Sequence, residues 1–433
     1  MKDGSVHNMD ALVLGGGIAG LQTSLDLADQ GYQVAVVEKT PSIGGNMIRL
    51  SKVFPTLDCA SCITTPKMAA AAHHENIHLY TNCELQNLSK ENGRFEALIR
   101  KKPRYVKEDQ CIGCRQCEDQ CPVYVSDPEQ GDFVAKKAIS IPFSNAIPQV
   151  ACLDDQFCML CGRCAQVCPK DAVDYFQQPE DFAIRAGTAI ASTGYSLTSV
   201  RDKPQYGSGN LHNVISSLQM ERLLAPHGPY NRVLRPADGK EPESVAFIQC
   251  VGSRDNSLGI PYCSRVCCMY AIKQAMLLSG ALPLADLTIY YMDIRAFGKG
   301  FEQFYQNAQA MGIEFVKGKV SWLSQGQDYQ VRLNFEDQIE SGVTHRDHDL
   351  VVLSLGMVPE WSPAPDTAPL SCAADGFLRT PHLQIDPTLS ETQGLFVAGT
   401  ASGPKDIPDT VSEAGAAAMK ASSYLESLNP AFQ

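Results

Sequence analysis

Short apolar runs separated by a helical stretch mark the beginning of the chain. Residues 11–14 are all apolar, and residues 33–37 form a second, largely apolar run that ends at Glu38. Unbroken apolar runs are typical of strands in a parallel sheet that is covered on both faces. The stretch 21–30 between them suits a helix, and Gly31 follows it as a helix-ending residue. The pattern predicts a strand–helix–strand unit of an α/β fold.

A glycine-rich turn connects the first predicted strand to the helix. Its glycines follow the pattern Gly-x-Gly-x-x-Gly at Gly15, Gly17 and Gly20. Glycines let a backbone approach a pyrophosphate closely, and the free N–H groups at the start of the helix favour its negative charge. An acidic residue about 20 positions later binds the ribose hydroxyls, a role that Glu38 fits. A glycine turn without a ligand is the alternative, but the strand–turn–helix–strand context favours a dinucleotide site.

Segments far apart in the chain favour FAD as this dinucleotide. Lys39 and a second glycine turn at Gly45 and Asn46 resemble the pattern of flavoprotein disulfide reductases and amine oxidases. Residues 187–194 resemble their strand–Thr-Gly element, and residues 394–400 resemble their closing FAD motif. The alanine-rich helix after that motif could stabilise the electron-rich edge of a reduced flavin with its N-terminus. The further candidates for cofactor binding are Thr193, Gly194, Gly399, Thr400, Lys405, Asp406 and Ile407.

Two copies of one cysteine pattern, Cys-x-x-Cys-x-x-Cys-x-x-x-Cys-Pro, lie within residues 111–169. This spacing is typical of dicluster ferredoxins, in which three close cysteines hold one 4Fe–4S cluster and the fourth reaches the other cluster. Zinc knuckles and disulfide frameworks are the alternatives. Zinc sites use paired rather than triple cysteine runs, and the sequence has no recognisable signal peptide of a secreted disulfide protein. We therefore expect one cluster on Cys111, Cys114, Cys117 and Cys168, and another on Cys158, Cys161, Cys164 and Cys121.

Four further cysteines stand where flavoproteins of this kind usually carry an NAD(P)H domain. The predicted strand 244–249 continues into Cys250 rather than into a second glycine loop, and Cys263, Cys267 and Cys268 follow. Their spacing is not one of the standard ferredoxin patterns. A third iron–sulfur cluster, buried structural cysteines and a redox thiol pair are all compatible with it, although adjacent cysteines do not easily form a relaxed disulfide with each other.

Longer strings of residues resemble the A-type flavin subunit of heterodisulfide reductase and its bacterial relatives over nearly the whole chain. These strings lie at 54–62, 65–68, 249–254, 262–268, 293–299 and 403–409. The resemblance implies an FAD-dependent oxidoreductase with several 4Fe–4S clusters, one of them held beside the flavin by Cys250, Cys263, Cys267 and Cys268. It also implies that Lys273 is a catalytic residue near flavin N5. From residue type alone, a solvent-exposed helix lysine is the expected alternative.

The chain is expected to correspond to the shorter bacterial members of this family, because it begins near the FAD loop and stops soon after the closing FAD motif. Such members include the A-type component of the quinone-interacting membrane-bound oxidoreductase and the equivalent component of benzoyl-CoA reductase complexes. The resemblance implies partners of several kinds: heterodisulfide reductase B- and C-like subunits, a hydrogenase- or dehydrogenase-linked subunit that supplies electrons, a ferredoxin, and a second copy in a homodimer. It identifies neither the physiological donor nor the acceptor.

The motifs predict a discontinuous FAD-binding domain of the Rossmann type, similar to thioredoxin reductase, with two other units inserted into it. We expect FAD-domain segments at 8–105, 179–240 and 341–433. A ferredoxin module with two 4Fe–4S clusters is expected at 106–178, and a second Rossmann-like domain with cluster-binding cysteines at 241–340.

Composition narrows the function classes further. A net charge of −12 over 433 residues argues against nucleic-acid binding, and no apolar run is long enough to span a bilayer. The 17 cysteines favour a reducing compartment, so a cytoplasmic location is expected, with membrane association only through partner subunits. Cys59 and Cys62 are compatible with a redox dithiol, but a structural or FAD-contact role is favoured. Arg295 and Lys299 could balance cofactor charge or contact a partner, and the sequence does not decide between these roles.

Together these features predict an electron-transfer subunit of a heterodisulfide-reductase-like complex. In one mode, electron pairs from a two-electron donor are split between ferredoxin and disulfide-type acceptors, which is anaerobic, flavin-based electron bifurcation. In the alternative mode, the chain is a simple relay to a quinone-interacting membrane complex or to an acyl-CoA (benzoyl-CoA) reductase. A non-catalytic scaffold for electron wiring is a third hypothesis. A reductase like the small subunit of glutamate synthase is disfavoured, because that family keeps a second glycine loop.

Overall fold

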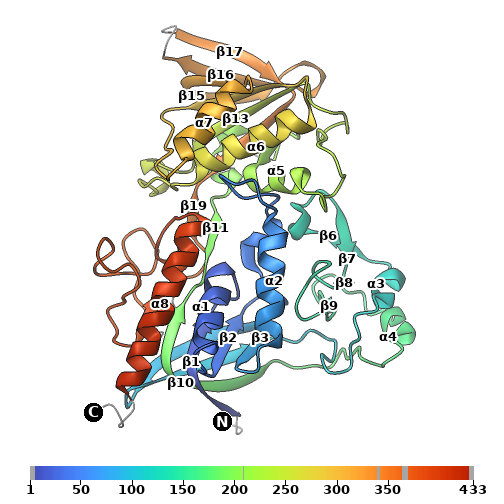
Figure 1. Ribbon diagram of the computed structural model, residues 1–433. Coiled ribbons are helices and arrows are strands. Elements are labelled where there is room, and N and C mark those ends of the chain that lie inside the picture. The colour runs from blue at the N-terminus through green and yellow to red at the C-terminus, as the bar shows by residue number, and fades with distance from the viewer. Residues whose placement is uncertain (1–4, 208, 339–341, 363–368, 429–433) are drawn as a thin grey trace.

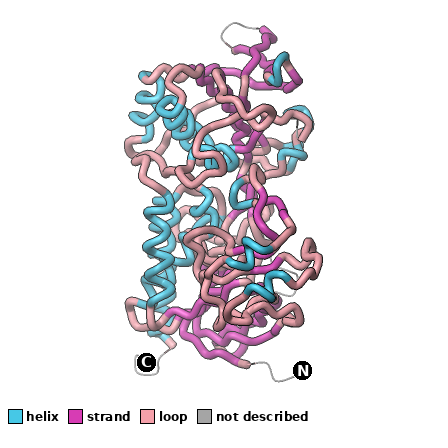
Figure 2. The backbone as a smooth tube through the Cα atoms, turned by 90° about the vertical axis from the view of Figure 1, so that its right-hand side faces the viewer, coloured by secondary structure: helices cyan, strands magenta, loops and turns pink. Residues whose placement is uncertain are grey.

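The chain forms two stacked lobes with a smaller module beside the lower one, as its computed structural model shows (Figure 1). The structure describes residues 5–207, 209–338, 342–362 and 369–428. The lower lobe holds both ends of the described chain, and the upper lobe is built from its middle. In Figure 2 the small module faces the viewer, with short helices and strands against the side of the lower lobe.

A mixed sheet organises the lower lobe. Its order is β3 (Ile77–Thr81), β2 (Val34–Glu38), β1 (Val6–Leu14), β10 (Glu180–Ala191), β5 (Arg94–Lys101) and β4 (Cys83–Glu91), and β20 (Leu395–Val397) also pairs with β10. Strands β1, β2, β3, β10 and β20 are parallel, whereas β5 is antiparallel to both β10 and β4. The apolar run 11–14 is fully covered inside β1, as its pattern predicts.

Helices α1 (Ile18–Ala28), α2 (Ala60–His73) and α8 (Ile407–Ser427) pack against this sheet and against one another. In α8 the buried face carries small side chains three to four residues apart, and Ala414, Ala418 and Ala421 have no exposed surface. Alanine favours the helix and lets a neighbouring helix approach closely. The alanine-rich segment predicted as a helix is therefore the close partner of α1.

The small module is inserted between β5 and β10, two strands that pair with each other in the lower sheet. It has a core of its own that includes Val106, Ile139 and Leu153, and a bridge between Val106 and Val173 joins its two ends. Its elements are α3 (Gln116–Gln120), β6 (Tyr124–Ser126), β7 (Ala135–Lys137), β8 (Ile139–Ser140), β9 (Cys152–Leu153) and α4 (Arg163–Val167).

A second mixed sheet organises the upper lobe. Its order is β12 (Val214–Ser216), β18 (Leu350–Leu355), β13 (Ser244–Val251), β14 (Asp286–Tyr291), β15 (Glu314–Gln325), β16 (Val331–Asp337) and β17 (Gly342–His348). The first five strands are parallel, and β16 and β17 continue as an antiparallel meander. Helices α5 (Ser217–Leu224), α6 (Cys267–Ala281) and α7 (Phe301–Ala310) cover one face of this sheet (Figure 1). The predicted α/β class is confirmed.

Strand pairing extends the upper lobe beyond the expected range 241–340. Strand β12 joins it from the range expected for the second FAD segment, and β17 and β18 join it from the range expected for the third. The reason is local, because the fully apolar β18 is covered only when it lies between β12 and β13. The expected boundary at 340/341 and the expected end at 429–433 lie outside the described residues.

Short elements complete the chain. Strands β11 (Tyr195–Leu197) and β19 (Met357–Pro359) pair with each other where the two lobes meet (Figure 1). Single turns of 3-10 helix occur at Gly45–Arg49, Pro128–Gln130, Val200–Asp202, Pro204–Tyr206, Asn256–Leu258, Gln327–Tyr329 and Gly399–Ser402.

Candidate flavin and iron–sulfur sites

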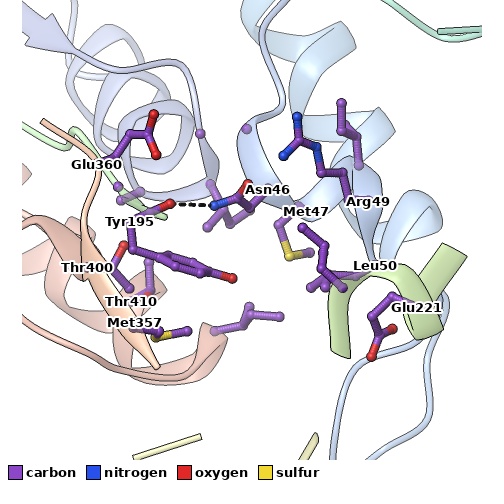
Figure 3. Close-up of a pocket in the computed structure, with 18 of the residues that line it drawn as sticks. Asn46, Met47, Arg49, Leu50, Tyr195, Glu221, Met357, Glu360, Thr400 and Thr410 are labelled. Carbon is purple, nitrogen blue, oxygen red and sulfur yellow. Dashed lines mark hydrogen bonds between the residues drawn. The ribbon is translucent and has the colours of Figure 1, made fainter. Parts of the chain in front are cut away.

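A cavity of about 310 Å³ lies where the two lobes and the inserted module meet. The loops after β1, β2 and β10 and the start of α8 form its lower walls, and α6 contributes to its upper wall. In Figure 3 the ring of Tyr195 lies across the space, with Thr400 and Met357 on its own side and Met47 and Leu50 opposite. The cavity is thus lined by the motifs from which a flavin site was predicted.

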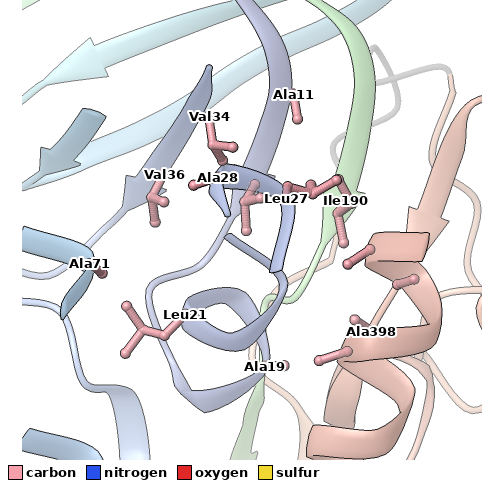
Figure 4. Close-up of a cluster of buried hydrophobic side chains, with 14 of the residues drawn as sticks. Ala11, Ala19, Leu21, Leu27, Ala28, Val34, Val36, Ala71, Ile190 and Ala398 are labelled. Carbon is pink, nitrogen blue, oxygen red and sulfur yellow. The ribbon is translucent and has the colours of Figure 1, made fainter. Parts of the chain in front are cut away.

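The glycine loop leaves one face of this cavity bare. A Cβ atom on Gly17 would have only one neighbour, the Gly45 Cα at 3.9 Å, so the position has room for a side chain that it lacks. Gly17 is also the N-cap of α1 and makes no side-chain cap, so the first N–H groups of α1 face the cavity without a side-chain acceptor. Buried side chains such as Leu21 and Leu27 anchor α1 beneath the loop (Figure 4). A dinucleotide pyrophosphate fits this bare, N–H-rich surface.

Gly20 has a different reason for being glycine. A Cβ atom there would lie 1.9 Å from the carbonyl oxygen of Gly15 and 2.7 Å from Ser192 Oγ, so no side chain fits. Gly15 itself has a φ of +108° and a Cβ atom on it would lie 2.4 Å from the carbonyl oxygen of Ser192. These two residues keep the loop closed against β10, whereas Gly17 keeps its outer face open.

This difference gives a matched prediction. Gly17→Ala should lower the affinity for FAD at least tenfold, about 1.4 kcal/mol, because the new methyl group occupies the bare face. The variant should lose only about 0.5–1 kcal/mol of stability, since alanine is a poorer N-cap than glycine. Fluorescence titration of the flavin-free protein with FAD measures the first effect, and chemical denaturation of the same protein measures the second.

Gly20→Ala is the contrasting variant for this experiment. Its methyl group would displace the Gly15 backbone, so both FAD binding and stability should fall together. Equal affinity of Gly17→Ala and the unmodified chain for FAD would refute the assignment of this loop to a pyrophosphate.

The carboxylate of Glu38 is tied into the loops that it follows. Its Oε2 accepts the N–H of Gly16 at 2.7 Å, and its Oε1 accepts the N–H and the hydroxyl of Thr40, each at 2.8 Å. Glu38 is buried at the cavity wall, while Lys39 beside it is half-exposed and forms an ion pair with Glu360. Glu38 is therefore held in a fixed orientation for a ribose, and Lys39 is balanced by an acid of the chain itself.

The other predicted FAD-binding residues fall into two groups. One group lines the cavity: Gly45, Asn46, Thr193, Gly194, Thr400, Lys405, Asp406 and Ile407. Within it, Asn46 Nδ2 donates to the carbonyl oxygen of Tyr195 at 2.8 Å (Figure 3). Gly20 and Gly399 form the second group and lie behind the wall. The N–H of Gly399 donates to Glu413 Oε2 at 2.9 Å, and Lys405 Nζ lies 2.5 Å from the same oxygen.

Lys273 lines the cavity and is buried, so the solvent-exposed alternative is wrong. Its ammonium lies 2.5 Å from Glu221 Oε1 and donates to the carbonyl oxygen of Lys52 at 2.7 Å. Burial lowers the pKa of Lys273, and the carboxylate opposes that shift. Burial also disfavours ionisation of Glu221, but Lys273 and the donors on Gln274 and Ser51 bring its pKa below the usual value. The pair places a fixed, compensated charge at the cavity.

Several cavity residues were missed by sequence reasoning. Tyr195, Glu221, Tyr270, Gln274 and Met357 all line the cavity, from elements that belong to both lobes. None of them stands in a glycine motif, and the helical spacing of Tyr270, Lys273 and Gln274 on α6 is the one signal that could have grouped three of the cavity residues.

Two small cavities in the inserted module bring the ferredoxin-type cysteines together in the crossed arrangement that their spacing predicts. The fourth cysteine of each pattern lies with the first three of the other. One cavity is lined by Cys111, Cys114, Cys117 and Cys168, and the other by Cys121, Cys158, Cys161 and Cys164. Four thiols around one space, without a carboxylate or an imidazole, form a donor set that suits iron–sulfur clusters.

Backbone N–H groups point at several of these sulfurs. The N–H of Leu160 donates to Cys158 Sγ at 3.4 Å, and the N–H of Ala172 donates to Cys168 Sγ at 3.3 Å. Burial raises the pKa of Cys117 to about 12, so without a metal this thiol stays neutral. Bound iron would favour the thiolate, and N–H donors to ligand sulfurs tune the cluster potential.

The other four predicted ligands meet at the carboxyl end of β13 and the start of α6. Cys250 has a φ of +61° at the end of the strand, and the N–H of Arg265 donates to Cys263 Sγ at 3.3 Å. Burial and the neighbouring thiols of Cys250 and Cys263 raise the pKa of Cys268 to about 11 and raise that of Cys267 further. The four thiols are thus mutual neighbours, which fits a shared multinuclear cluster.

Two further observations concern metal and thiol chemistry. Within the described parts of the chain, no group of three or more His, Cys, Asp or Glu side chains is arranged to hold a single metal ion. Cys59 is the N-cap of α2, and its Sγ accepts the N–H of Cys62 at 3.4 Å. A hydrogen bond with the Cys62 thiol lowers the pKa of Cys59 and raises that of Cys62. Neither residue lines the flavin cavity, and Cys59 lies on a separate cavity of about 530 Å³ beside the inserted module.

Comparisons with known families agree with these sites. The family described as FAD dependent oxidoreductase matches residues 10–61, which contain the glycine loop and Glu38. The family described as 4Fe-4S dicluster domain matches residues 110–172, which contain both cysteine patterns of the module. An FAD-dependent oxidoreductase domain and a 4Fe–4S dicluster domain are therefore both present.

Curated relatives extend the similarity to nearly the whole chain. The A-type subunit of the H(2):CoB-CoM heterodisulfide,ferredoxin reductase of Methanothermobacter thermautotrophicus is 45% identical over 415 residues, which are 95% of this chain and 63% of that protein. The chain is a homologue of the A-type subunits of heterodisulfide reductases. The A-type iron-sulfur subunit of the CoB–CoM heterodisulfide reductase of Methanocaldococcus jannaschii is 43% identical over 420 residues, again 95% of this chain and 63% of the relative. The resemblance stated from the sequence is confirmed.

This heterodisulfide reductase homologue spans about 63% of the length of the first relatives. It spans 53% of the A-type subunit of the ferredoxin:CoB-CoM heterodisulfide reductase of Methanosarcina mazei, to which it is 41% identical. Among solved structures it is similar to thioredoxin reductase from T. acidophilum, with a TM-score of 0.53, 13% identity and coverage of 98% of this chain and 100% of that chain. The Lactococcus lactis thioredoxin reductase gives the same TM-score at 11% identity, with 97% and 99% coverage. These two neighbours confirm the thioredoxin reductase-like fold. None of the described helices has the length and apolar character needed to cross a membrane.

Proposed function

We propose that this chain is the FAD and iron–sulfur electron-transfer subunit of a heterodisulfide-reductase-like complex. The single observation that carries the proposal is that two separate cysteine regions approach one flavin-type cavity. The expected partners, B- and C-like subunits and an electron-input subunit, follow from the names of the relatives, which are all A-type subunits of larger reductases.

The first approach runs through α6. Val266 and Tyr270 line the cavity, and Cys267 stands between them in the sequence, at the first position of the helix. The Tyr270 hydroxyl donates to the carbonyl oxygen of Leu355 at 3.4 Å, and Cys267 Sγ lies 4.0 Å from the same oxygen. One tyrosine side chain therefore separates the cavity from a thiol of the proposed third cluster, held by Cys250, Cys263, Cys267 and Cys268.

The second approach runs through the inserted module. Pro142 and Phe143 line the flavin cavity, and the preceding Ile141 lines the space between the cysteines of the first ferredoxin-type set. Arg115 Nη2 also donates to the carbonyl oxygen of Phe143 at 3.4 Å, and Arg115 lines the same cysteine cavity. Three consecutive residues thus connect the cavity with Cys111, Cys114, Cys117 and Cys168.

The residues at the cavity have roles that follow from their positions. Bound FAD would exchange electron pairs with a donor and release electrons singly to iron–sulfur centres. Gly17 and the start of α1 would hold the pyrophosphate, Glu38 the ribose, and the N-terminus of α8 would stabilise negative charge near the flavin. Lys273 would supply positive charge beside the reacting ring, with Glu221 fixing its position.

Anaerobically prepared protein tests the proposal directly. We expect about one FAD and roughly twelve irons per chain, as three 4Fe–4S clusters require, with overlapping EPR signals after chemical reduction. Roughly eight irons, together with alkylation of the four cysteines between 250 and 268 under native conditions, would remove the third cluster from the proposal. Absence of bound flavin in iron-loaded protein would overturn the proposal as a whole.

Electron bifurcation is the finer form of this proposal, and a simple relay is its alternative. The two approaches reach the cavity from different lobes, which suits delivery of single electrons to two acceptors. Spectroelectrochemical titration of the bound flavin separates the two modes. Strongly crossed one-electron potentials support splitting, whereas a second electron that leaves more readily than the first is not needed by a relay that feeds a quinone-linked or acyl-CoA reductase complex.

A further inference from the structure

A basic surface patch lies beside the third cysteine set. It consists of Arg254, Arg265, Arg295 and Lys299 with the exposed ring of Phe297, and we refer to these five residues as the arginine patch. They come from the loops after β13 and β14 and from the loop before α6, three segments that are distant in sequence. Sequence reasoning left Arg295 and Lys299 without a role.

Specific contacts hold the arginine patch together. Arg254 Nη1 lies 2.6 Å and Arg295 Nε 3.4 Å from the same Asp293 oxygen. Arg265 lies over the ring of Phe297, with 5.1 Å between the guanidinium carbon and the ring centroid, and its Nη2 lies 3.1 Å from Asp409. The patch is therefore an ordered surface.

The charge of the patch is opposite to that of the protein. Its four cations face two acids, Asp293 and Asp409, so the local balance is 4 − 2 = +2, whereas the chain as a whole carries −12. The side chains of Arg254, Arg265 and Arg295 keep 27%, 41% and 41% of their surface exposed, and Phe297 keeps 57%. Ion pairs this exposed contribute little to folding, so their N–H donors remain available to a partner.

The patch also lies directly over the proposed third cluster. The Arg254 guanidinium acts on the Cys250 thiol, and that of Arg295 acts on the Cys263 thiol and is in hydrogen-bonding reach of it. Cys268 Sγ lies 3.7 Å from the carbonyl oxygen of Asp293, the acid that Arg254 and Arg295 share. One layer of side chains thus separates these thiols from solvent.

We propose that the arginine patch is the docking surface for an acidic ferredoxin, with the Phe297 ring at its centre. Ordered cations around an exposed aromatic residue match the usual anatomy of a protein interface, and opposite charges would steer an acidic carrier to this one basic area. A carrier docked here would lie within one side-chain layer of a redox centre. The proposal rests on the assignment of Cys250, Cys263, Cys267 and Cys268 to a cluster.

Binding measurements on the flavin- and iron-loaded chain test this inference. The probe is an acidic bacterial ferredoxin with two 4Fe–4S clusters, immobilised under anaerobic conditions. The test variant is the double replacement Arg265→Glu/Lys299→Glu, because neither side chain touches a cysteine thiol in the contacts above. We expect at least tenfold weaker binding at low ionic strength, and a smaller salt dependence of the remaining affinity.

The control variant is Arg185→Glu, which reverses an equally exposed arginine (47% side-chain exposure, paired with Glu96) on the lower sheet. It should change the affinity less than twofold. Equal loss in both variants, or full binding by the double variant, would overturn the docking surface. Leu160→Ser, on the exposed apolar surface beside the ferredoxin-type cysteines, supplies a second arm. Loss of binding in that variant alone would place the carrier on the module and overturn the inference.

Iron analysis of each variant distinguishes this failure from failure of the proposed function. If the double variant keeps roughly twelve irons and still binds ferredoxin, the docking surface is wrong and the cluster assignment stands. If the unmodified chain never contains more than roughly eight irons, the cluster assignment is wrong whatever the binding result.

Discussion

Replacement of Cys267 by alanine should remove about four of roughly twelve irons per chain and leave FAD and the two ferredoxin-type clusters in place. Cys267 is the thiol next to Tyr270 and the flavin cavity, and it is 6% exposed at the start of α6. Alanine favours a helix, so the helix itself should persist. Iron analysis and EPR of the reduced protein measure the loss. In stopped-flow reduction, the flavin should also lose its fastest electron exit through α6.

Cys83→Ala is the matched control, because Cys83 is a buried thiol (1% exposed) outside every cysteine set described above. Burial raises its pKa to about 11, as for Cys268, yet its thiol accompanies no other cysteine. The control should keep the full iron content. An unchanged iron content in Cys267→Ala, or an equal loss in both variants, would contradict a cluster on Cys250, Cys263, Cys267 and Cys268.

Replacement of Glu221 by glutamine should lower the free energy of unfolding by about 3–5 kcal/mol, the usual cost of leaving one member of a buried ion pair without its partner. Lys273 and Glu221 are only 2% and 3% exposed, so solvent cannot compensate. The pKa of Glu221 is lowered in the folded protein, so its contribution is complete above its ordinary value of 4.5 and is lost as the pH falls through the folded value. Urea denaturation of the upper lobe, followed by near-UV circular dichroism, measures the effect.

The double variant Glu221→Gln/Lys273→Met should cost less than the sum of the two single variants. It removes both buried charges, whereas each single variant strands one. Flavin potentials give an independent measure of the role of Lys273 at the cavity. Lys273→Met should keep FAD bound and shift its redox steps, whereas a purely structural lysine would alter stability and leave the potentials unchanged.

Local sequence patterns were sufficient for the parts of the fold that depend on local chemistry. The apolar run 11–14 predicted β1 because a strand covered on both faces needs an unbroken apolar sequence. The crossed sharing of Cys121 and Cys168 followed from spacing, since two short helices present the cysteines to common spaces. Such features need no knowledge of distant neighbours.

Other features depend on contacts between segments far apart in the chain. The solvent-exposed alternative for Lys273 failed because its partner Glu221 lies 52 residues earlier, on another helix. Gly20 and Gly399 belong to binding motifs, yet their effect is exerted through packing behind the wall, which only a backbone trace reveals. The expected range 241–340 was too short for the upper sheet because β12 and β18 complete it from outside.

The way the inserted module joins the lower sheet has a consequence for how such proteins change. Lys101 and Glu180 are paired neighbours on β5 and β10, so the 78 residues between them leave and re-enter the sheet at one point. Gain or loss of the whole segment therefore needs no rearrangement of the remaining strands, because a short hairpin turn would join the same two residues. A redox wire fitted in this manner is a transplantable part, and the flavin scaffold can acquire or discard it in a single genetic event.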